Sequence, residues 1–224
     1  MAELAQNPEV LRARVASVRA ALAAAVGGSV GEVEWRVAAS VTQLGLTARL
    51  LSPVLGVAAL FHRVLDVDLA RLRWQPEAGS AFPLSVQGGP SSGPVIAASD
   101  VPAGTELARL IAIAIVRGPV GALVQTLSSA YSLSPVVLWG NVASAVNGTA
   151  CMLAASRPEL SERAYGLAST VLSELPVRLL DPTPGPQFRR HSCCLIYRIT
   201  PGRQSGICGD CVLQPDIGQG RRRR

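Results

Sequence analysis

Near its C-terminus the chain reads RRHSCCLIYRITPGRQSGICGDC (residues 189–211). Four of the five cysteines stand in this segment, first as the adjacent pair Cys193-Cys194 and, thirteen residues later, as Cys208 and Cys211 in a Cys-x-x-Cys spacing. In a reducing compartment, clustered cysteines bind metal or carry out redox chemistry more often than they form structural disulfides. The segment therefore predicts a metal-binding module.

The residues between the two cysteine pairs are expected to bring the pairs together. Residues 195–199 favour a strand, and Pro201-Gly202 favours a turn that reverses the chain. Because adjacent side chains of a strand point to opposite faces, one residue of Cys193-Cys194 must lie in a bend if both bind the same group. Gly206 and Gly209 permit positive φ and leave backbone N–H groups free to point at sulfur.

Three chemistries compete for the four thiols. Structural zinc sites usually combine two Cys-x-x-Cys or Cys/His knuckles, which an adjacent pair of cysteines matches poorly. Disulfides have less support in a reducing cytosol. A cluster of two irons and two sulfides spreads its attachment points more widely than one tetrahedral ion does, and so tolerates an irregular half site. We predict a 2Fe-2S cluster whose ligands are Cys193, Cys194, Cys208 and Cys211.

Positive charge is expected beside such a cluster. Two ferric ions, two sulfides and four thiolates sum to a charge of −2, reduction makes it −3, and nearby cations raise the reduction potential. Four arginines close in sequence are candidates for docking a substrate or an electron donor: Arg189, Arg190, Arg198 and Arg203. The alternative interpretation is a solvated basic face.

The net charge of +6 lies entirely at the C-terminal end. Residues 1–188 hold 13 arginines against 13 acidic residues, whereas residues 189–224 hold 8 arginines against 2 aspartates. The terminal run Arg221 to Arg224 is expected to be a solvated, disordered tail. Because the aromatic residues of a single-strand binder are not interleaved with these charges, no nucleic-acid partner is expected.

The composition predicts a folded and mainly helical body. The 224 residues are 49% hydrophobic and 16% charged, which is enough to bury a sizeable core. The apolar runs 41–61 and 105–127 are interrupted by arginine and proline, so we expect buried helices and no transmembrane segment. Since no secretory signal is evident, a cytoplasmic location is expected.

Capping residues followed by proline mark several helix starts, at Asn7-Pro8, Ser52-Pro53 and Ser134-Pro135. Short segments at 72–75 and 82–86 are better suited to a small sheet. The expected helices are 8–25, ending at Gly27-Gly28, then 36–51, 53–64, 105–131 with a break at Gly118-Pro119, 135–155 and 158–174. Cys151 falls on the fifth of these, where a buried small apolar residue is the expected role.

The fold class predicted is α+β, predominantly α-helical with a small β-sheet and a C-terminal cysteine-rich cluster-binding module. Prolines at 182, 184 and 186 favour an extended linker that sets the cysteine segment apart. The expected organisation is a helical domain at 1–180 with a short β insertion near 71–87, a linker at 181–188, the module at 189–214 and the basic tail at 215–224.

Gly140, in Trp139-Gly140-Asn141, stands inside an expected helix, where glycine costs about 1 kcal/mol relative to alanine. Such a glycine implies a close contact at that turn. The contact could be the cysteine module, or it could be ordinary helix packing in which Asn141 satisfies a backbone group.

Taken together, these segments resemble the FhuF-like ferric-siderophore reductases. The resemblance lies in Cys193-Cys194-Leu-Ile-Tyr-Arg, in Gly206-Ile-Cys-Gly-Asp-Cys211, and in helical segments around 38–53 and 138–144. The family usually has about ten residues between its cysteine pairs, whereas this chain has thirteen. The extra residues are expected in the turn at 201–205.

The resemblance implies one-electron reduction of a ferric siderophore by a 2Fe-2S protein. Ferrous iron is bound more weakly than ferric iron by hard oxygen ligands, so reduction releases the metal. No dinucleotide-binding glycine fingerprint is present, which favours a donor protein such as a ferredoxin or flavodoxin. Two other hypotheses remain open, a non-catalytic iron-sulfur carrier or sensor and a zinc-stapled helical binding module.

Overall fold

The computed structural model describes residues 2–65, 72–74, 84–86, 95–96, 105–199 and 207–214. Helices dominate these residues. They are α1 (Ala2–Gln6), α2 (Pro8–Val26), α3 (Trp35–Phe61), α4 (Thr105–Arg117), α5 (Pro119–Tyr131), α6 (Pro135–Ser156) and α7 (Ser161–Glu174), with short 3-10 helices η1 (Val30–Glu32), η2 (Pro158–Leu160) and η3 (Ile196–Ile199).

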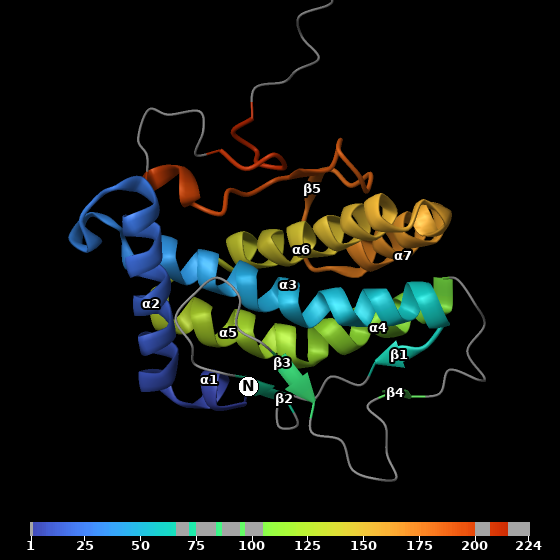
Figure 1. The fold of residues 1–224 in the computed structure, drawn as a ribbon, viewed down its shortest axis with the longest axis horizontal. Helices are drawn as coiled ribbons and strands as arrows, with labels where there is room; N and C mark the ends of the chain where they lie inside the picture. Colours follow the sequence, from blue (N-terminus) through green and yellow to red (C-terminus); the bar gives the residue numbers. More distant parts are fainter. Residues whose placement is uncertain are drawn as a thin grey trace, which may run out of the picture.

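Helix α3 runs through the centre of the bundle (Figure 1). It packs against α6 and α7 on one side and against α5 on the other, while α2 crosses its N-terminal half. Small residues allow this close packing, because Ala38, Ala39, Ala58 and Ala59 are all fully buried along α3. The core is therefore built largely from alanine, valine and leucine, as the composition predicts.

The capping signals place most helix ends correctly. The Asn7 side chain accepts hydrogen bonds from the backbone N–H groups of the first turn of α2, and Pro8 occupies the first helical position. The same helix ends at Gly27, which adopts the left-handed conformation with φ of 67°. Ser134 caps α6 in the same way as Asn7 caps α2.

The predicted break at Ser52-Pro53 is wrong, because α3 continues through Pro53 as one helix of 27 residues. Ser52 does not cap a new helix, since its hydroxyl donates to the carbonyl of Ala48 one turn earlier, at 2.7 Å. Apolar residues on both sides of the proline are buried, namely Leu50, Leu51, Val54 and Leu55. Packing on both sides thus outweighs the hydrogen bond that proline cannot make.

The strands among the described residues form three two-stranded antiparallel sheets. Strand β1 (Val64–Leu65) pairs with β4 (Val95–Ile96), and β2 (Leu72–Trp74) pairs with β3 (Leu84–Val86) in the expected β insertion. Strand β5 (Leu179–Asp181) pairs with β6 (Arg189–Arg190). The predicted fold class, mostly helical with a small β component, is confirmed.

The proline-rich connection is held against the helices, so the expectation that it sets the cysteine segment apart is wrong. Pairing of β5 with β6 brings its two ends together. In its middle, Gly185 donates its N–H to Asn147 Oδ1 at 2.7 Å, and its carbonyl accepts from Asn147 Nδ2 at 3.2 Å. The amide of Asn147 on α6 thus fixes the backbone of the connection at two points.

Within the part of the chain that the structure describes, three helical stretches are long and apolar enough to cross a membrane on length and composition alone: Trp35–Phe61, Glu106–Tyr131 and Pro135–Ser156. The sequence argument from interrupted apolar runs did not identify them as candidates. In the folded chain about half of each apolar window is buried inside the protein. The second stretch is also divided at Gly118, where α4 ends and α5 begins.

Candidate metal centre

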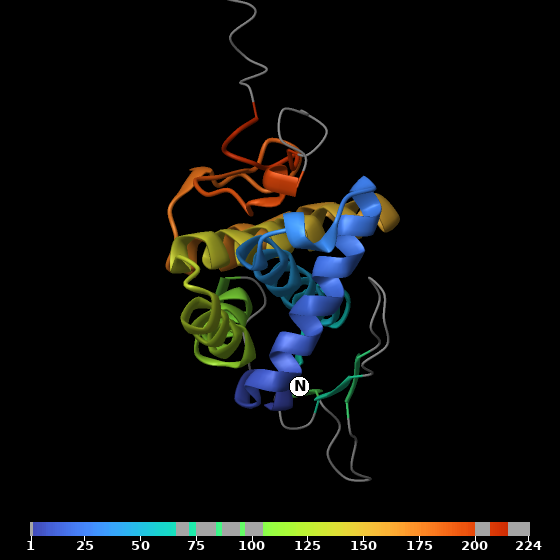
Figure 2. The ribbon, with the colours of Figure 1, turned by 90° about the vertical axis from the view of Figure 1, so that its left-hand side faces the viewer.

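The cysteine module lies along α6 and over the N-terminal end of α3, on the side of the bundle opposite the β2–β3 hairpin (Figures 1 and 2). Strand β6 packs against α6, and η3 packs against α2 and α3. The module is therefore part of the same packed body as the helices. Phe188, which is buried at its start, joins the main hydrophobic core.

The Cys193-Cys194 pair lies in irregular chain that follows a bend at residues 191–192. The strand predicted over 195–199 is absent from this described segment, because Leu195 has a positive φ of 71° and Ile196–Ile199 form η3 instead. The structure has bends on both sides of the pair, at residues 191–192 and at Leu195, rather than at Cys193 or Cys194, and neither cysteine lies in a strand. The turn at Pro201-Gly202 lies outside the described residues.

The two cysteine pairs converge as predicted. The Sγ atoms of Cys194 and Cys208 are 3.1 Å apart. The thiol of Cys193 lies close enough to the Cys194 and Cys211 thiols for hydrogen bonding. Backbone N–H groups also point at sulfur, since Leu195 donates to Cys193 Sγ at 3.3 Å and Leu213 to Cys211 Sγ at 3.4 Å.

The pKa values of the cysteine thiols are shifted in opposite directions. The pKa of Cys194 lies well below its ordinary value, because the Cys193 and Cys208 thiols donate hydrogen bonds to it and Arg190 adds positive charge. The pKa values of Cys193 and Cys208 are raised, chiefly because each thiol donates to Cys194. Metal binding would release the protons that the thiols hold.

Arg190 is completely buried, with 0% of its side chain exposed. The expectation that it docks a partner at the surface is therefore wrong. Its Nη1 donates to Asn141 Oδ1 at 2.9 Å, and its Nη2 donates to Asp210 Oδ1 at 3.2 Å. Burial lowers its pKa, but the charges of Asp210 and Cys194 outweigh this effect and raise the pKa above its ordinary value.

The other three predicted docking arginines differ in their surroundings. Arg189 is half-buried and donates to the carbonyls of Pro186 and Phe188. Arg198 is exposed and forms an ion pair with Glu34 at 2.8 Å, which balances part of its charge. Arg203 lies outside the described residues.

Gly140 contacts the cysteine module, which decides between the two interpretations of this glycine. A Cβ atom at this position would lie 2.0 Å from Ser192 Oγ and 3.6 Å from Arg190 Cδ. The glycine therefore leaves room for the module to approach α6. Asn141 is likewise part of this contact, through Arg190.

Two further polar residues complete the contact, and the sequence analysis did not single them out. Asp210 lies between Cys208 and Cys211, and its carboxylate binds Arg190 and accepts a short hydrogen bond from Ser144 on α6. In the sequence, Ser144 could have been recognised as a polar residue inside an apolar helix. The partner of Asp210 could not be identified without the fold, because Arg190 and Ser144 are distant in sequence.

The residues around the thiols fit an iron-sulfur cluster. Arg190 Nε and Ser192 Oγ are buried and make no hydrogen bond within the part of the chain that the structure describes. Donors of this kind are suited to the sulfur atoms of a cluster. The same part of the chain contains no group of three or more His, Cys, Asp or Glu side chains arranged to hold one metal ion.

The outer edge of the site is open to solvent. Cys193 and Cys208 are partly exposed, whereas Cys194 and Cys211 are each only 1% exposed. Three exposed apolar side chains stand near them in the module, namely Tyr197, Val212 and Leu213. One side of the thiol group therefore faces the helices, and the other reaches the surface.

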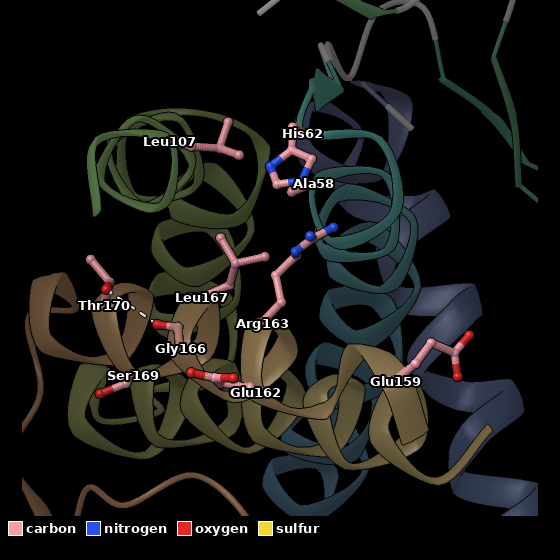
Figure 3. Close-up of a pocket in the computed structure, with 10 residues that line it drawn as sticks. All are labelled: Ala58, His62, Leu107, Glu159, Glu162, Arg163, Gly166, Leu167, Ser169 and Thr170. Atoms are coloured by element: carbon pink, nitrogen blue, oxygen red, sulfur yellow. Dashed lines mark hydrogen bonds between the residues drawn. The ribbon is translucent and has the colours of Figure 1, made fainter. Parts of the chain in front are cut away.

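A cavity of about 660 Å³ lies elsewhere, between α3, α4 and α7 (Figure 3). His62 and Arg163 project into it beside Leu107, while Glu159 and Glu162 stand at its edge. Its wall contains Ala58 of α3, whereas Ser40 of the same helix lies beneath the cysteine module. At 1.5 Å per residue these two positions are about 27 Å apart along the helix, so the cavity is remote from the thiols.

Comparisons with known proteins place the module in a described domain family. Residues 190–213 match the family model described as FhuF 2Fe-2S C-terminal domain. Comparisons with curated proteins and with solved structures gave no significant match. The match begins at Arg190, the second residue of β6, and includes all four clustered cysteines. The C-terminal module, which packs on the body of helices, is thus similar to this domain family over residues 190–213.

Proposed function

We propose that this protein reduces ferric siderophore complexes by one electron and so releases ferrous iron in the cytoplasm. The observation that carries the proposal is the convergence of two cysteine pairs in a segment that matches the FhuF 2Fe-2S domain. Cys193, Cys194, Cys208 and Cys211 would hold a 2Fe-2S cluster. When bound, such a cluster supplies a site that accepts and passes on single electrons.

The overall reaction needs no acid, base or nucleophile. One electron leaves a reduced donor protein and reaches the ferric ion of the chelate, which becomes ferrous, and no covalent bond of the chelate is broken. Hard oxygen ligands hold ferrous iron much more weakly, so the metal dissociates. The protein has to bind the chelate near the thiols and to set a suitable potential.

The surface around Cys193 and Cys208 suits this task. These two thiols reach the surface, and the neighbouring side chains of Tyr197, Val212 and Leu213 offer an apolar contact. Arg189 and Arg198 add positive charge that attracts an anionic chelate or an acidic donor. The remote cavity at His62 is too far from the thiols for direct electron transfer to a chelate bound there.

The test begins with anaerobic protein that has been reduced by dithionite and freed of excess reductant. It is mixed with a ferric hydroxamate or a ferric catecholate in the presence of a chromogenic ferrous chelator. The proposal predicts reoxidation of the protein and one ferrous ion per electron delivered. Protein that remains reduced with both chelates would contradict the reductase proposal and favour a non-catalytic carrier or sensor.

A further inference from the structure

Arg190 is the largest fully buried side chain of the described residues, and it lies close enough to Cys194 and Cys208 to interact with them electrostatically. A guanidinium remains protonated throughout the accessible pH range, so this position carries a fixed positive charge. Burial of such a charge is unfavourable unless counter-charges and hydrogen bonds compensate for it. The groups that contact the Arg190 guanidinium therefore indicate the role of its charge.

The hydrogen bonds of Arg190 satisfy only part of its donor capacity. Nη1 is bound by Asn141 and Nη2 by Asp210, and the backbone N–H of Arg190 donates to the carbonyl of Asp210 at 3.0 Å. Nε is buried, yet no acceptor for it is found among the described residues. The charge of Asp210 is also shared with Ser144, which donates to its second carboxylate oxygen.

The part of the Arg190 charge that Asp210 does not balance acts on the cysteine thiols. Arg190 interacts electrostatically with the sulfur atoms of Cys194 and Cys208. A four-thiolate 2Fe-2S cluster becomes more negative when it is reduced, so a fixed cation beside its ligands stabilises the reduced state. In a buried site this effect is screened weakly by solvent and salt.

Asn141 determines where this charge lies. Its Nδ2 donates to the carbonyl of Ser40 at 3.1 Å, and to Ser40 Oγ and Gln43 Oε1 at 3.0 Å each. Because the acceptors on α3 engage the amino group, the amide oxygen must face Arg190. Gln43 is fixed in turn by donating to Thr47 Oγ1 at 3.0 Å. The helical body thus orients the guanidinium of the cysteine module.

We propose that Arg190 raises the reduction potential of the cluster and that Asn141 is the positioning residue that holds it there. The inference rests on the proposed cluster site and identifies the charge that raises the reduction potential of the cluster. Of the three module arginines that the structure describes, Arg190 is buried, whereas Arg189 and Arg198 reach solvent. The expected influence of the exposed arginines on the potential is correspondingly small.

The experiment measures the midpoint potential of the anaerobically reconstituted full-length protein by redox titration with EPR detection. Arg190→Gln is expected to disfavour reduction at least tenfold, which is about 59 mV for a one-electron couple. Arg189→Gln removes the same charge one residue away and is the matched control, with an expected shift well below tenfold. The g-values should change in the first variant and not in the second. Equal reduction potentials in Arg190→Gln and Arg189→Gln would overturn the inference.

A second pair of variants tests the same inference if the Arg190→Gln protein fails to bind the cluster. Asn141→Ala retains the charge but removes its anchor, and it is expected to lower the potential relative to Asn147→Ala. Asn147 is a matched control because it lies on the same helix and contacts Gly185 rather than Arg190. Equal potentials in this pair would also overturn the inference.

Neither pair of variants involves a ferric chelate, so failure of this inference is distinguishable from failure of the reductase proposal. A wild-type protein that binds no cluster would overturn both.

Discussion

Gly140 is the residue at which the helical body and the cysteine module come closest. A methyl group added at Gly140 would overlap Ser192 Oγ. We predict that Gly140→Ala lowers the free energy of unfolding by about 1 kcal/mol or more, because the buried Ser192 side chain must move to make room. Thermal and urea unfolding measure the effect.

The control for this prediction is Gly148→Ala on the same helix, where nothing lies within 4 Å of the added Cβ. Alanine is the better helix former, so this variant is expected to gain up to about 1 kcal/mol. Adding Ser192→Ala to Gly140→Ala should restore part of the loss, since it removes the overlapping hydroxyl. Equal stability of the two alanine variants would show that Gly140 is not the contact point.

At the scale of residues, the sequence predicted the cysteines but not their surroundings. The spacing of Cys193, Cys194, Cys208 and Cys211 was sufficient to group them, and the structure brings the two pairs together. The burial of Arg190 was not predictable, because its partners Asn141 and Asp210 are 49 and 20 residues away in the chain. The sequence gives no sign that Arg190, rather than its neighbour Arg189, turns inward.

Helix α3 is the element in which sequence and structure differ most. Its interior proline lacks the N–H that would complete the helical hydrogen bond to the carbonyl four residues earlier. We predict that Pro53→Ala raises the free energy of unfolding by about 1 kcal/mol or more, since proline costs about 3 kcal/mol in a helix interior. Urea unfolding monitored by circular dichroism measures this change.

Pro135→Ala is the matched comparison, because Pro135 occupies the first helical position of α6, where no N–H partner is lost. It should gain little or no stability. A similar result for Pro53→Ala would mean that a separate helix begins there, as the capping pattern alone predicts.

The other elements show which local signals suffice. Helix ends with a capping side chain or a glycine were predicted closely, as at Asn7 and Gly27 in α2. The strand predicted over 195–199 failed because the β preference of these side chains could not reveal the positive φ at Leu195. Likewise, the prolines of 182–186 indicated a connection without helix, but not that it turns back between β5 and β6 or that Asn147 holds it in place.

At the scale of the whole molecule, the charge distribution governs how a partner approaches. The net charge of +6 arises from the last 36 residues, which include the cysteine module. We predict that the rate of electron transfer from an acidic ferredoxin or flavodoxin falls about tenfold or more between low and high salt, because screening weakens the attraction. Stopped-flow measurement of cluster reduction provides the rates.

An uncharged reductant is the control in that experiment, and its rate should depend little on salt. A donor-protein rate that stays constant or increases with salt would contradict electrostatic docking on this face. The result would leave the cluster site itself unaffected.

The central claim is that four particular cysteines hold a two-iron cluster. The most direct measurement is the iron, sulfide and zinc content of the anaerobically purified protein, together with the EPR spectrum after dithionite reduction. We predict two irons and two sulfides per chain and a rhombic signal in the wild type and in Cys151→Ala, with loss of both when Cys193, Cys194, Cys208 or Cys211 is replaced by alanine. A zinc-loaded, colourless wild type, or a full cluster in a variant that lacks one of these four cysteines, would contradict the account.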